Sequence, residues 1–354
     1  MSTAPVLDFP ATVRPLSADT PLNPDAAVSV RGLSHRYRDV HALRDVSVDI
    51  PRNTICGLLG PNGAGKTTAM SLISGQERPS AGTLRVFGRE PFDDAAVLTQ
   101  LCFARENQAY PDTFTVRHVL ATCPLFLPHW DAAFADELVE MFRLPLQRRI
   151  RKLSRGQLSA VAIVAGLASR APLTFLDEPY LGLDPTARRR FYDVLLRDYT
   201  EHPRTILMST HLIGEVEGFF EQVLVIDDGR LLVDAAAEDI ADLAYTVSGP
   251  AGAVQSATDN RQVLETHRIG GLASAVVLGA PDAGMRRRAA ESGLEVGEVG
   301  LQDLIAALGA APHGAVPDGA APDGAGPDGA AESESDSDAH DRDDDENESQ
   351  EAAR

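Results

Sequence analysis

The sequence contains few cysteines and no long hydrophobic run. Its three cysteines, Cys56, Cys102 and Cys123, are too widely separated for a disulfide framework or a zinc site, and they fit a reducing compartment. The longest strongly apolar stretch, residues 160–168, is about half of the roughly 20 residues that a membrane-spanning helix needs. The N-terminal segment lacks the basic-then-apolar pattern of a secretion signal. We therefore expect a cytoplasmic protein that reaches a membrane only through a partner.

Positive charge, and lysine in particular, is also scarce. Lys66 and Lys152 are the only lysines among 32 basic residues, against 52 acidic residues and a formal net charge of −20. This balance argues against a generic nucleic-acid or anionic-membrane binder. Residues 311–354 alone carry 14 acidic and two basic residues, so more than half of the net charge lies in the last eighth of the chain.

The pattern along the chain predicts four parts. Residues 1–27, with five prolines, predict a flexible leader. Strands alternating with helices over 28–235 predict a largely parallel sheet covered by helices, with 89–170 mostly helical. Residues 236–310 predict a small α/β appendix with a short strand at 275–278 and helices at 284–292 and 301–308. The acidic repeats of 311–354 predict a disordered tail, either a solvated polyanion or an inhibitory or partner-binding segment.

Within the second part, short apolar runs predict strands and amphipathic runs predict helices. The expected strands are 28–30, 46–50, 55–59, 83–87, 173–176, 205–208 and 223–226, and the expected helices are 66–74, 186–199 and 211–220.

A glycine-rich segment at residues 60–67, Gly-Pro-Asn-Gly-Ala-Gly-Lys-Thr, joins an apolar strand to a helix. It is a complete G-x-x-x-x-G-K-[ST] phosphate-binding loop. Its glycines let the backbone wrap around phosphate oxygens and point N–H groups at them, and the helix N-terminus adds its positive end. Lys66 supplies a charge for the outer phosphates, and the Thr67 hydroxyl suits Mg²⁺.

Residues 173–178, Leu-Thr-Phe-Leu-Asp-Glu, form an apolar run that ends in two carboxylates. A buried strand would bring Asp177 beside the phosphate loop, where it can orient Mg²⁺ through its water shell. Glu178 is then the candidate general base for the attacking water. An apolar strand that ends at the solvent-exposed surface has the same pattern. The phosphate loop upstream favours the catalytic interpretation.

Residues 153–157, Leu-Ser-Arg-Gly-Gln, come before that strand. Ser154 and Gln157 have the spacing of a capping box that starts a helix. A serine-capped helix N-terminus followed by a glycine also suits a second phosphate-binding surface. The structural and the functional interpretation are compatible here.

In this order the motifs resemble the nucleotide-binding domain of ATP-binding cassette (ABC) transporters, over about residues 28–233. The signature of that family is similar to 153–157, with Arg155 at its tolerant middle position. Residues 182–185, Gly-Leu-Asp-Pro, resemble the D-loop, although the residues before Leu-Asp are not the more usual small pair. Ser-Thr-His at 209–211 resembles the segment with the switch histidine, and Tyr37 stands where the family has an aromatic that stacks on adenine.

The family also has a glutamine between the phosphate loop and the signature, which reaches Mg²⁺ and the water and faces the membrane subunit. We assign it to Gln108 in the segment 105–112. Counting back from Thr115 falls nearer Arg105 or Glu106, and an exposed loop amide is the other interpretation of Gln108.

The resemblance implies a role for each matching residue. Catalysis is assigned to Glu178, His211 and Gln108, and the metal to Thr67, Gln108 and Asp177. Contacts to ATP are assigned to Tyr37, Gly60, Pro61, Asn62, Gly63, Ala64, Gly65, Lys66, Thr67, Thr68, Ser154, Gly156, Gln157 and Asp184.

The resemblance further implies the fold and the activity. The expected fold is the P-loop NTPase core of ABC ATPases, with a mostly parallel sheet, an antiparallel β subdomain, an inserted helical subdomain, the α/β appendix and the acidic tail. The expected activity is Mg²⁺-dependent ATP hydrolysis in a dimer with an identical or related cassette. Two ATP molecules would lie between the phosphate loop of one chain and Ser154 and Gly156 of the other.

We expect this dimer to power export through separate transmembrane permease subunits, which would hold it at the inner face of the cell membrane. The alternative is a soluble ABC-type ATPase that acts on ribosomes or nucleic acid. One cassette, no sustained heptads and the acidic charge disfavour it. A small-molecule kinase would leave residues 153–157 unexplained.

Overall fold

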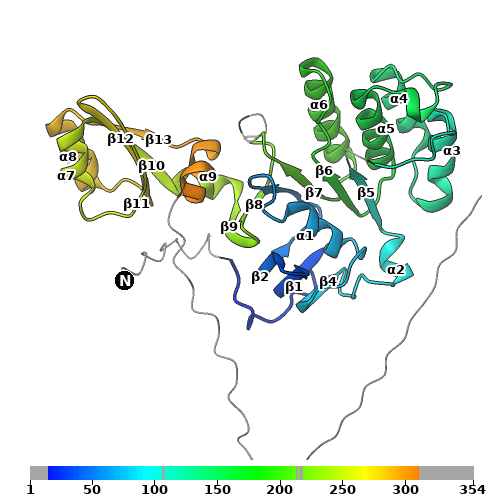
Figure 1. Ribbon diagram of the computed structural model, residues 1–354, viewed down its shortest axis with the longest axis horizontal. Coiled ribbons are helices and arrows are strands. Elements are labelled where there is room, and N and C mark those ends of the chain that lie inside the picture. Colours follow the sequence, from blue (N-terminus) through cyan, green and yellow to red (C-terminus); the bar gives the residue numbers. More distant parts are fainter. Residues whose placement is uncertain (1–14, 106–107, 213, 215–217, 311–354) are drawn as a thin grey trace, which may run out of the picture. The chain divides into compact units, whose positions relative to one another are not determined.

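The computed structural model describes residues 15–105, 108–212, 214 and 218–310 (Figure 1). The expected acidic tail and the first half of the expected leader lie outside the described residues. So do Glu106, one of the alternatives to Gln108, and part of the helix expected over 211–220.

The main sheet has six strands, in the order β5-β6-β7-β3-β8-β9 (Figure 1). Neighbouring strands are parallel except for the antiparallel pair β8-β9. Short apolar runs form these strands because both faces of the sheet are covered. The strands are β3 (Ile55–Leu59), β5 (Leu101–Arg105), β6 (Leu173–Asp177), β7 (Thr205–Thr210), β8 (Gln222–Asp227) and β9 (Arg230–Ala236).

A separate antiparallel sheet has the order β2-β1-β4. It consists of β1 (Val28–Tyr37), β2 (Val40–Ile50) and β4 (Ala81–Val86). Its alternating apolar residues share one buried cluster with side chains from β3 and from the helix that follows the phosphate loop. The strands expected around residues 28, 46 and 83 are therefore present, and the first two are longer than expected.

The helices of this part begin with α1 (Lys66–Ile73) and the short α2 (Ala95–Leu98). A helical group, α3 (Val116–Phe126), α4 (Ala132–Met141) and α5 (Arg155–Ala168), packs together, and α6 (Pro185–Glu201) follows β6 (Figure 1). The expected fold class is confirmed: a mostly parallel α/β core with an antiparallel subdomain and an inserted helical group. No described helix has the length and apolar character needed to cross a bilayer.

The expectation that residues 89–170 are mostly helical is wrong at one point. Leu101–Arg105 forms β5, the edge strand of the central sheet, parallel to β6. Phe103 packs edge-on against Phe175 of β6, with ring centroids 5.3 Å apart. A five-residue apolar run has too few residues to distinguish a helical from a strand period, so only the pairing with β6 decides.

The C-terminal part has a four-stranded antiparallel sheet in the order β11-β12-β10-β13. The expected helices are present as α8 and α9. The sequence did not predict most of the strands of this sheet. β11 exposes most of its side chains, so it lacks an apolar alternation. The elements are β10 (Ala244–Pro250), α7 (Ala251–Thr258), β11 (Val263–Ile269), β12 (Leu272–Leu278), α8 (Ala283–Ser292), β13 (Glu295–Glu298) and α9 (Leu301–Ala310).

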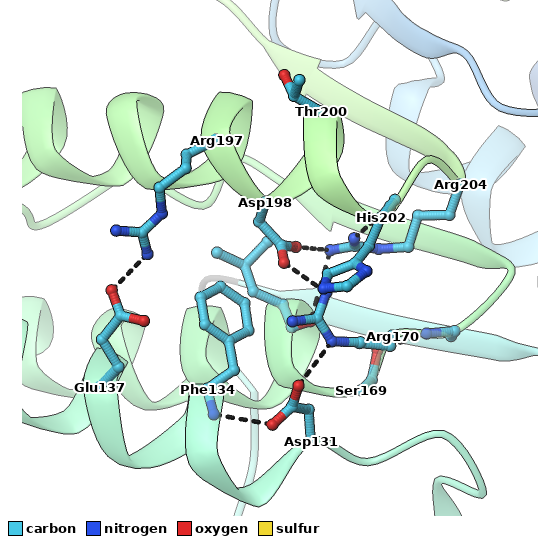
Figure 2. A network of polar contacts seen from close by, with 12 residues as sticks. Asp131, Phe134, Glu137, Ser169, Arg170, Arg197, Asp198, Thr200, His202 and Arg204 are labelled. Atoms are coloured by element: carbon cyan, nitrogen blue, oxygen red, sulfur yellow. Dashed lines mark hydrogen bonds and ion pairs between the residues drawn. The ribbon is translucent and has the colours of Figure 1, made fainter.

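A buried ionic network connects the helical group to α6 and β7 (Figure 2). Arg170, just after α5, contacts Asp131 at 2.9 Å and Asp198 at 2.6 Å. Asp198 on α6 also contacts Arg204 at 2.7 Å, and both of these side chains are almost fully buried. Asp131 in turn caps α4 by accepting a hydrogen bond from Phe134 N. The network therefore holds the N-terminus of α4 and the C-terminus of α5 against α6.

We expect Asp198→Asn to lower the free energy of unfolding by about 2 kcal/mol, because Arg204 loses its buried carboxylate partner and Arg170 loses one of its two. Chemical denaturation of the full chain measures this change. The matched control is Glu137→Gln, which breaks the exposed Glu137–Arg197 pair in the same region and costs at most about 1 kcal/mol. Equal losses for the two variants would contradict the prediction.

A half-buried carboxylate, Asp234 on β9, makes the stability depend on pH. Burial and the nearby Asp49 together raise the pKa of Asp234 to about 6, although the hydrogen bond from Gln222 opposes the shift. The folded state thus binds the proton more tightly than the unfolded chain. This contribution to stability is present at acidic pH and is lost as the pH rises through about 6.

Asp234→Asn, which keeps the oxygen that accepts from Gln222, should therefore stabilise the protein by about 1–2 kcal/mol at pH 8. The difference should shrink as the pH is lowered through the pKa, because the wild-type carboxyl is then neutral too. Denaturation curves of both proteins at pH 5 and pH 8 test this. A difference that is the same at both pH values would refute it.

Candidate active site

A cleft of 880 Å³ lies where β3 and β6 end. It brings together the phosphate loop, the two carboxylates at the end of β6 and the histidine after β7. Its lining residues are Val40, His41, Ala42, Asn62, Gly63, Gly65, Lys66, Thr67, Thr68, Arg105, Arg155, Asp177, Glu178, Leu181, His211, Asp228 and Gly229.

The phosphate loop packs tightly against the sheet. Gly60 has a φ of 147°, and a Cβ atom at this position would lie 2.0 Å from the carbonyl oxygen of Ile226. No side chain fits there, so a glycine is required for the loop to leave β3 in this direction. The loop then enters α1 at Lys66.

Lys66 is held inside this loop. Its Nζ donates hydrogen bonds to the carbonyl oxygens of Gly60 and Pro61, both at 2.9 Å, and lies 3.8 Å from Glu178 Oε1. Burial lowers the pKa of Lys66, and the carboxylates of Glu178 and Asp177 oppose that shift. A buried ammonium against two carboxylates gives the cleft a fixed positive charge beside a candidate base.

Asp177 and Thr67 lie in contact across the cleft. The Thr67 hydroxyl donates to Asp177 Oδ2 at 2.9 Å, and Ser209 Oγ donates to Asp177 Oδ1 at 2.6 Å. One hydroxyl and one carboxylate are the hard oxygen donors that Mg²⁺ takes from proteins that also bind phosphates. Among the described residues no cluster of three or more His, Cys, Asp or Glu could hold a metal by itself. The donor set therefore fits a metal that is shared with phosphate oxygens.

Glu178 turns out of the strand in a left-handed conformation, with a φ of 48°. This conformation is costly for a residue with a side chain, and tertiary contacts hold it here. Its N–H donates to Ser209 Oγ at 2.9 Å, and its Oε2 lies 2.7 Å from His211 Nδ1. The carboxylate is thus fixed between the lysine of the loop and the histidine after β7.

Other residues expected in the site do not line this cleft. Tyr37 lies at the end of β1, is 44% exposed and donates to Glu77 at 2.5 Å. Gln108 is absent from the lining, whereas Arg105, one of its alternatives, is present. The further expected residues outside the lining are Gly60, Pro61, Ala64, Ser154, Gly156, Gln157 and Asp184. Their expected contacts to ATP remain predictions.

The start of α5 has the capping box that its sequence predicts. Ser154 Oγ accepts a hydrogen bond from Gln157 N, and Gln157 Oε1 accepts one from Ser154 N. Asp184 caps α6 in a similar way by accepting from Ala187 N at 2.8 Å. Ser154, Gln157 and Asp184 therefore each have a structural role in addition to the expected one.

Ser209 and His41 were not assigned to the site from the sequence, and Arg105 was considered only as an alternative position for the glutamine. Ser209 forms hydrogen bonds with both the Asp177 carboxylate and the backbone N–H of Glu178. The sequence feature that could have indicated this role is its position two residues before His211. His41, on β2, lines the cleft and has no local motif. Arg105 lies there because β5 pairs with β6, which sets its Cα opposite that of Asp177.

Two family models match the chain. One, described as ABC transporter, matches residues 43–181, and one, described as an AAA domain with a putative AbiEii toxin of a type IV toxin–antitoxin system, matches 146–217. The daunorubicin resistance ATP-binding protein DrrA3 of Streptomyces coeruleorubidus is 33% identical over 225 residues, covering 61% of this chain and 70% of that protein. This chain belongs to the ABC transporter ATP-binding proteins.

Further comparisons agree with this ABC family. The doxorubicin resistance ATP-binding protein DrrA of Mycobacterium tuberculosis is 31% identical over 229 residues, or 62% of this chain and 68% of that protein. A solved structure of an ATP-binding subunit of an ABC transporter has 26% identity and a TM-score of 0.55, covering 60% of this chain and 91% of that one. The ABC subunit described here therefore binds and hydrolyses ATP, and the ribosome or nucleic-acid alternative is not favoured.

Proposed function

We propose that this ABC subunit hydrolyses Mg-ATP in the cleft described above and thereby drives export through separate membrane subunits. The observation that carries the proposal is the convergence of Lys66, Asp177, Glu178 and His211 on one cleft. Thr67 and Asp177 would hold Mg²⁺. Held there, it would supply positive charge that offsets the charge developing during hydrolysis.

In this proposal Glu178 accepts the proton of the attacking water. The carboxylate lies 2.7 Å from His211 Nδ1, so the histidine can keep it oriented and can stabilise its charge. Lys66 supplies positive charge for the outer phosphates from a position 3.8 Å from Glu178. The base and the phosphate-binding cation are thus neighbours, as an in-line attack on the terminal phosphate requires.

The signature residues support a dimeric site. Ser154, Gly156 and Gln157 lie outside the lining of their own cleft, although they start a helix of 14 residues whose N-terminus suits an anion. In the proposed dimer they contact the ATP of the opposing subunit. That subunit is a second copy of this chain or a related cassette.

Export is the direction favoured by the relatives, which are named for resistance to daunorubicin and doxorubicin. The permease subunits would be separate chains that hold this subunit at the inner face of the membrane. The helical group α3–α5 and the Gln108 segment are the surface proposed to receive them.

The test is purification of the tagged full chain from solubilised membranes, followed by transport in inside-out vesicles with daunorubicin as the probe. We expect a membrane protein with several spans to copurify, and ATP-dependent daunorubicin uptake that Glu178→Gln abolishes. Recovery with ribosomes, without such a membrane protein, would overturn the proposal. ATP-dependent uptake that persists in Glu178→Gln would overturn the assignment of the site.

A further inference from the structure

Tyr180 is a fully buried tyrosine, with no exposed surface, two residues after Glu178. It does not line the cleft, and its hydroxyl reaches Thr210 at the end of β7. The hydroxyl accepts hydrogen bonds from Thr210 Oγ1 at 2.8 Å and from the backbone N–H of His211 at 3.0 Å. It also lies 3.4 Å from His211 Nδ1. A single buried oxygen thus contacts both the backbone and the side chain of the switch histidine.

The contacts of this hydroxyl fix the turn that presents His211. Thr210 Oγ1 accepts a hydrogen bond from Leu212 N at 3.0 Å and donates one to the Tyr180 hydroxyl. The residues directly before and after His211 are therefore both held by hydrogen bonds. Burial raises the pKa of Tyr180, and the hydrogen bonds from Thr210 and His211 oppose the shift. The phenol therefore stays protonated at neutral pH and acts as a fixed dipole.

Tyr180 also belongs to the turn that touches the signature helix. Leu181 N donates to Glu178 O at 3.1 Å and Leu183 N donates to Tyr180 O at 3.0 Å, which makes residues 178–183 a compact turn. Ser159 on α5 donates to Leu181 O at 2.6 Å. A displacement of α5 therefore acts on the same short turn that carries the tyrosine.

We propose that Tyr180 is a positioning residue that couples the signature helix α5 to the catalytic pair Glu178–His211. It does not line the cleft and acts through His211. The coupling path consists of Ser159, the turn at Leu181, the Tyr180 hydroxyl and the His211 backbone. Its first and last steps are hydrogen bonds, and the covalent chain joins Leu181 to Tyr180 between them. This inference rests on the proposed catalytic role of Glu178 and His211.

The first test compares Tyr180→Phe with the wild type in the full chain. Removal of the hydroxyl leaves the N–H of His211 and the Thr210 hydroxyl without their acceptor, so we expect kcat to fall about tenfold. The affinity for ATP, measured with Glu178→Gln in both backgrounds to prevent turnover, should stay the same. The matched control is Tyr245→Phe, which removes another buried tyrosine hydroxyl on β10 and should leave kcat unchanged.

A second test separates coupling from mere stability. Ser159→Ala breaks the contact of α5 to the turn, and a double-mutant cycle with Tyr180→Phe measures whether the two act on kcat together. We expect the double variant to be about as slow as Tyr180→Phe alone. Strictly multiplicative effects, or a kcat of Tyr180→Phe equal to that of the wild type, would overturn the proposal.

The outcome is independent of transport. Both tests measure ATP hydrolysis, so they could still be interpreted if the proposed export function were wrong and ATPase activity were retained. If Glu178→Gln kept full activity, the assignment of the catalytic pair would fail first. If Glu178→Gln were inactive and Tyr180→Phe fully active, only the coupling proposal would fail.

Discussion

Glu178→Gln is expected to reduce steady-state ATP hydrolysis about a thousandfold while ATP binding is retained. Glutamine has the same shape and can keep the contact to His211, but it cannot accept the proton of the attacking water. Because hydrolysis reopens the proposed dimer, the variant should accumulate as a dimer when ATP and Mg²⁺ are present. Phosphate release measures the first effect, and size-exclusion chromatography with light scattering measures the second.

The matched control is Glu140→Gln on the exposed side of α4, which removes the same charge without touching the cleft. It should hydrolyse ATP at the wild-type rate. Activity of Glu178→Gln close to that of the wild type would mean that another group acts as the base. A monomeric variant with bound ATP would argue against the shared site.

Gly156→Ala is expected to have the second largest effect. A Cβ atom at this position would lie 2.3 Å from the carbonyl oxygen of Gly182, so the signature helix cannot keep its contact with the D-loop segment. We expect hydrolysis to fall by about a hundredfold, comparable to the loss of one transition-state hydrogen-bond donor. ATP binding by the isolated subunit should change little, because Gly156 does not line its own cleft.

The control for this substitution is Gly252→Ala on α7. An added Cβ there meets no atom within 4 Å, so activity should be unchanged and the helix slightly stabilised. Thermal unfolding of both variants shows whether overpacking at Gly156 unfolds the protein instead, at a cost of about 1–3 kcal/mol. A well-folded Gly156→Ala with full ATPase activity would contradict the proposed role of the signature.

Several elements were predictable because a local pattern carries the information. The helix from Pro185 follows a capping aspartate and a proline at its first position, and the structure begins α6 there. The helix at Arg155 follows its capping box in the same way. By contrast, β5 lacked such a signal, since it depends on pairing with β6, which is distant in sequence.

The sequence alone determined the phosphate loop, the carboxylates at the end of β6 and the capped signature helix. Each is a short segment whose residue types and spacing suffice for its conformation, and together they imply the ABC family. Only the tertiary structure decided that Ser209 binds both Asp177 and Glu178, and that the Tyr180 hydroxyl holds the backbone of His211. These contacts join the ends of neighbouring parallel strands, and the order of strands in a sheet is set by packing of the whole chain rather than by any local run of residues.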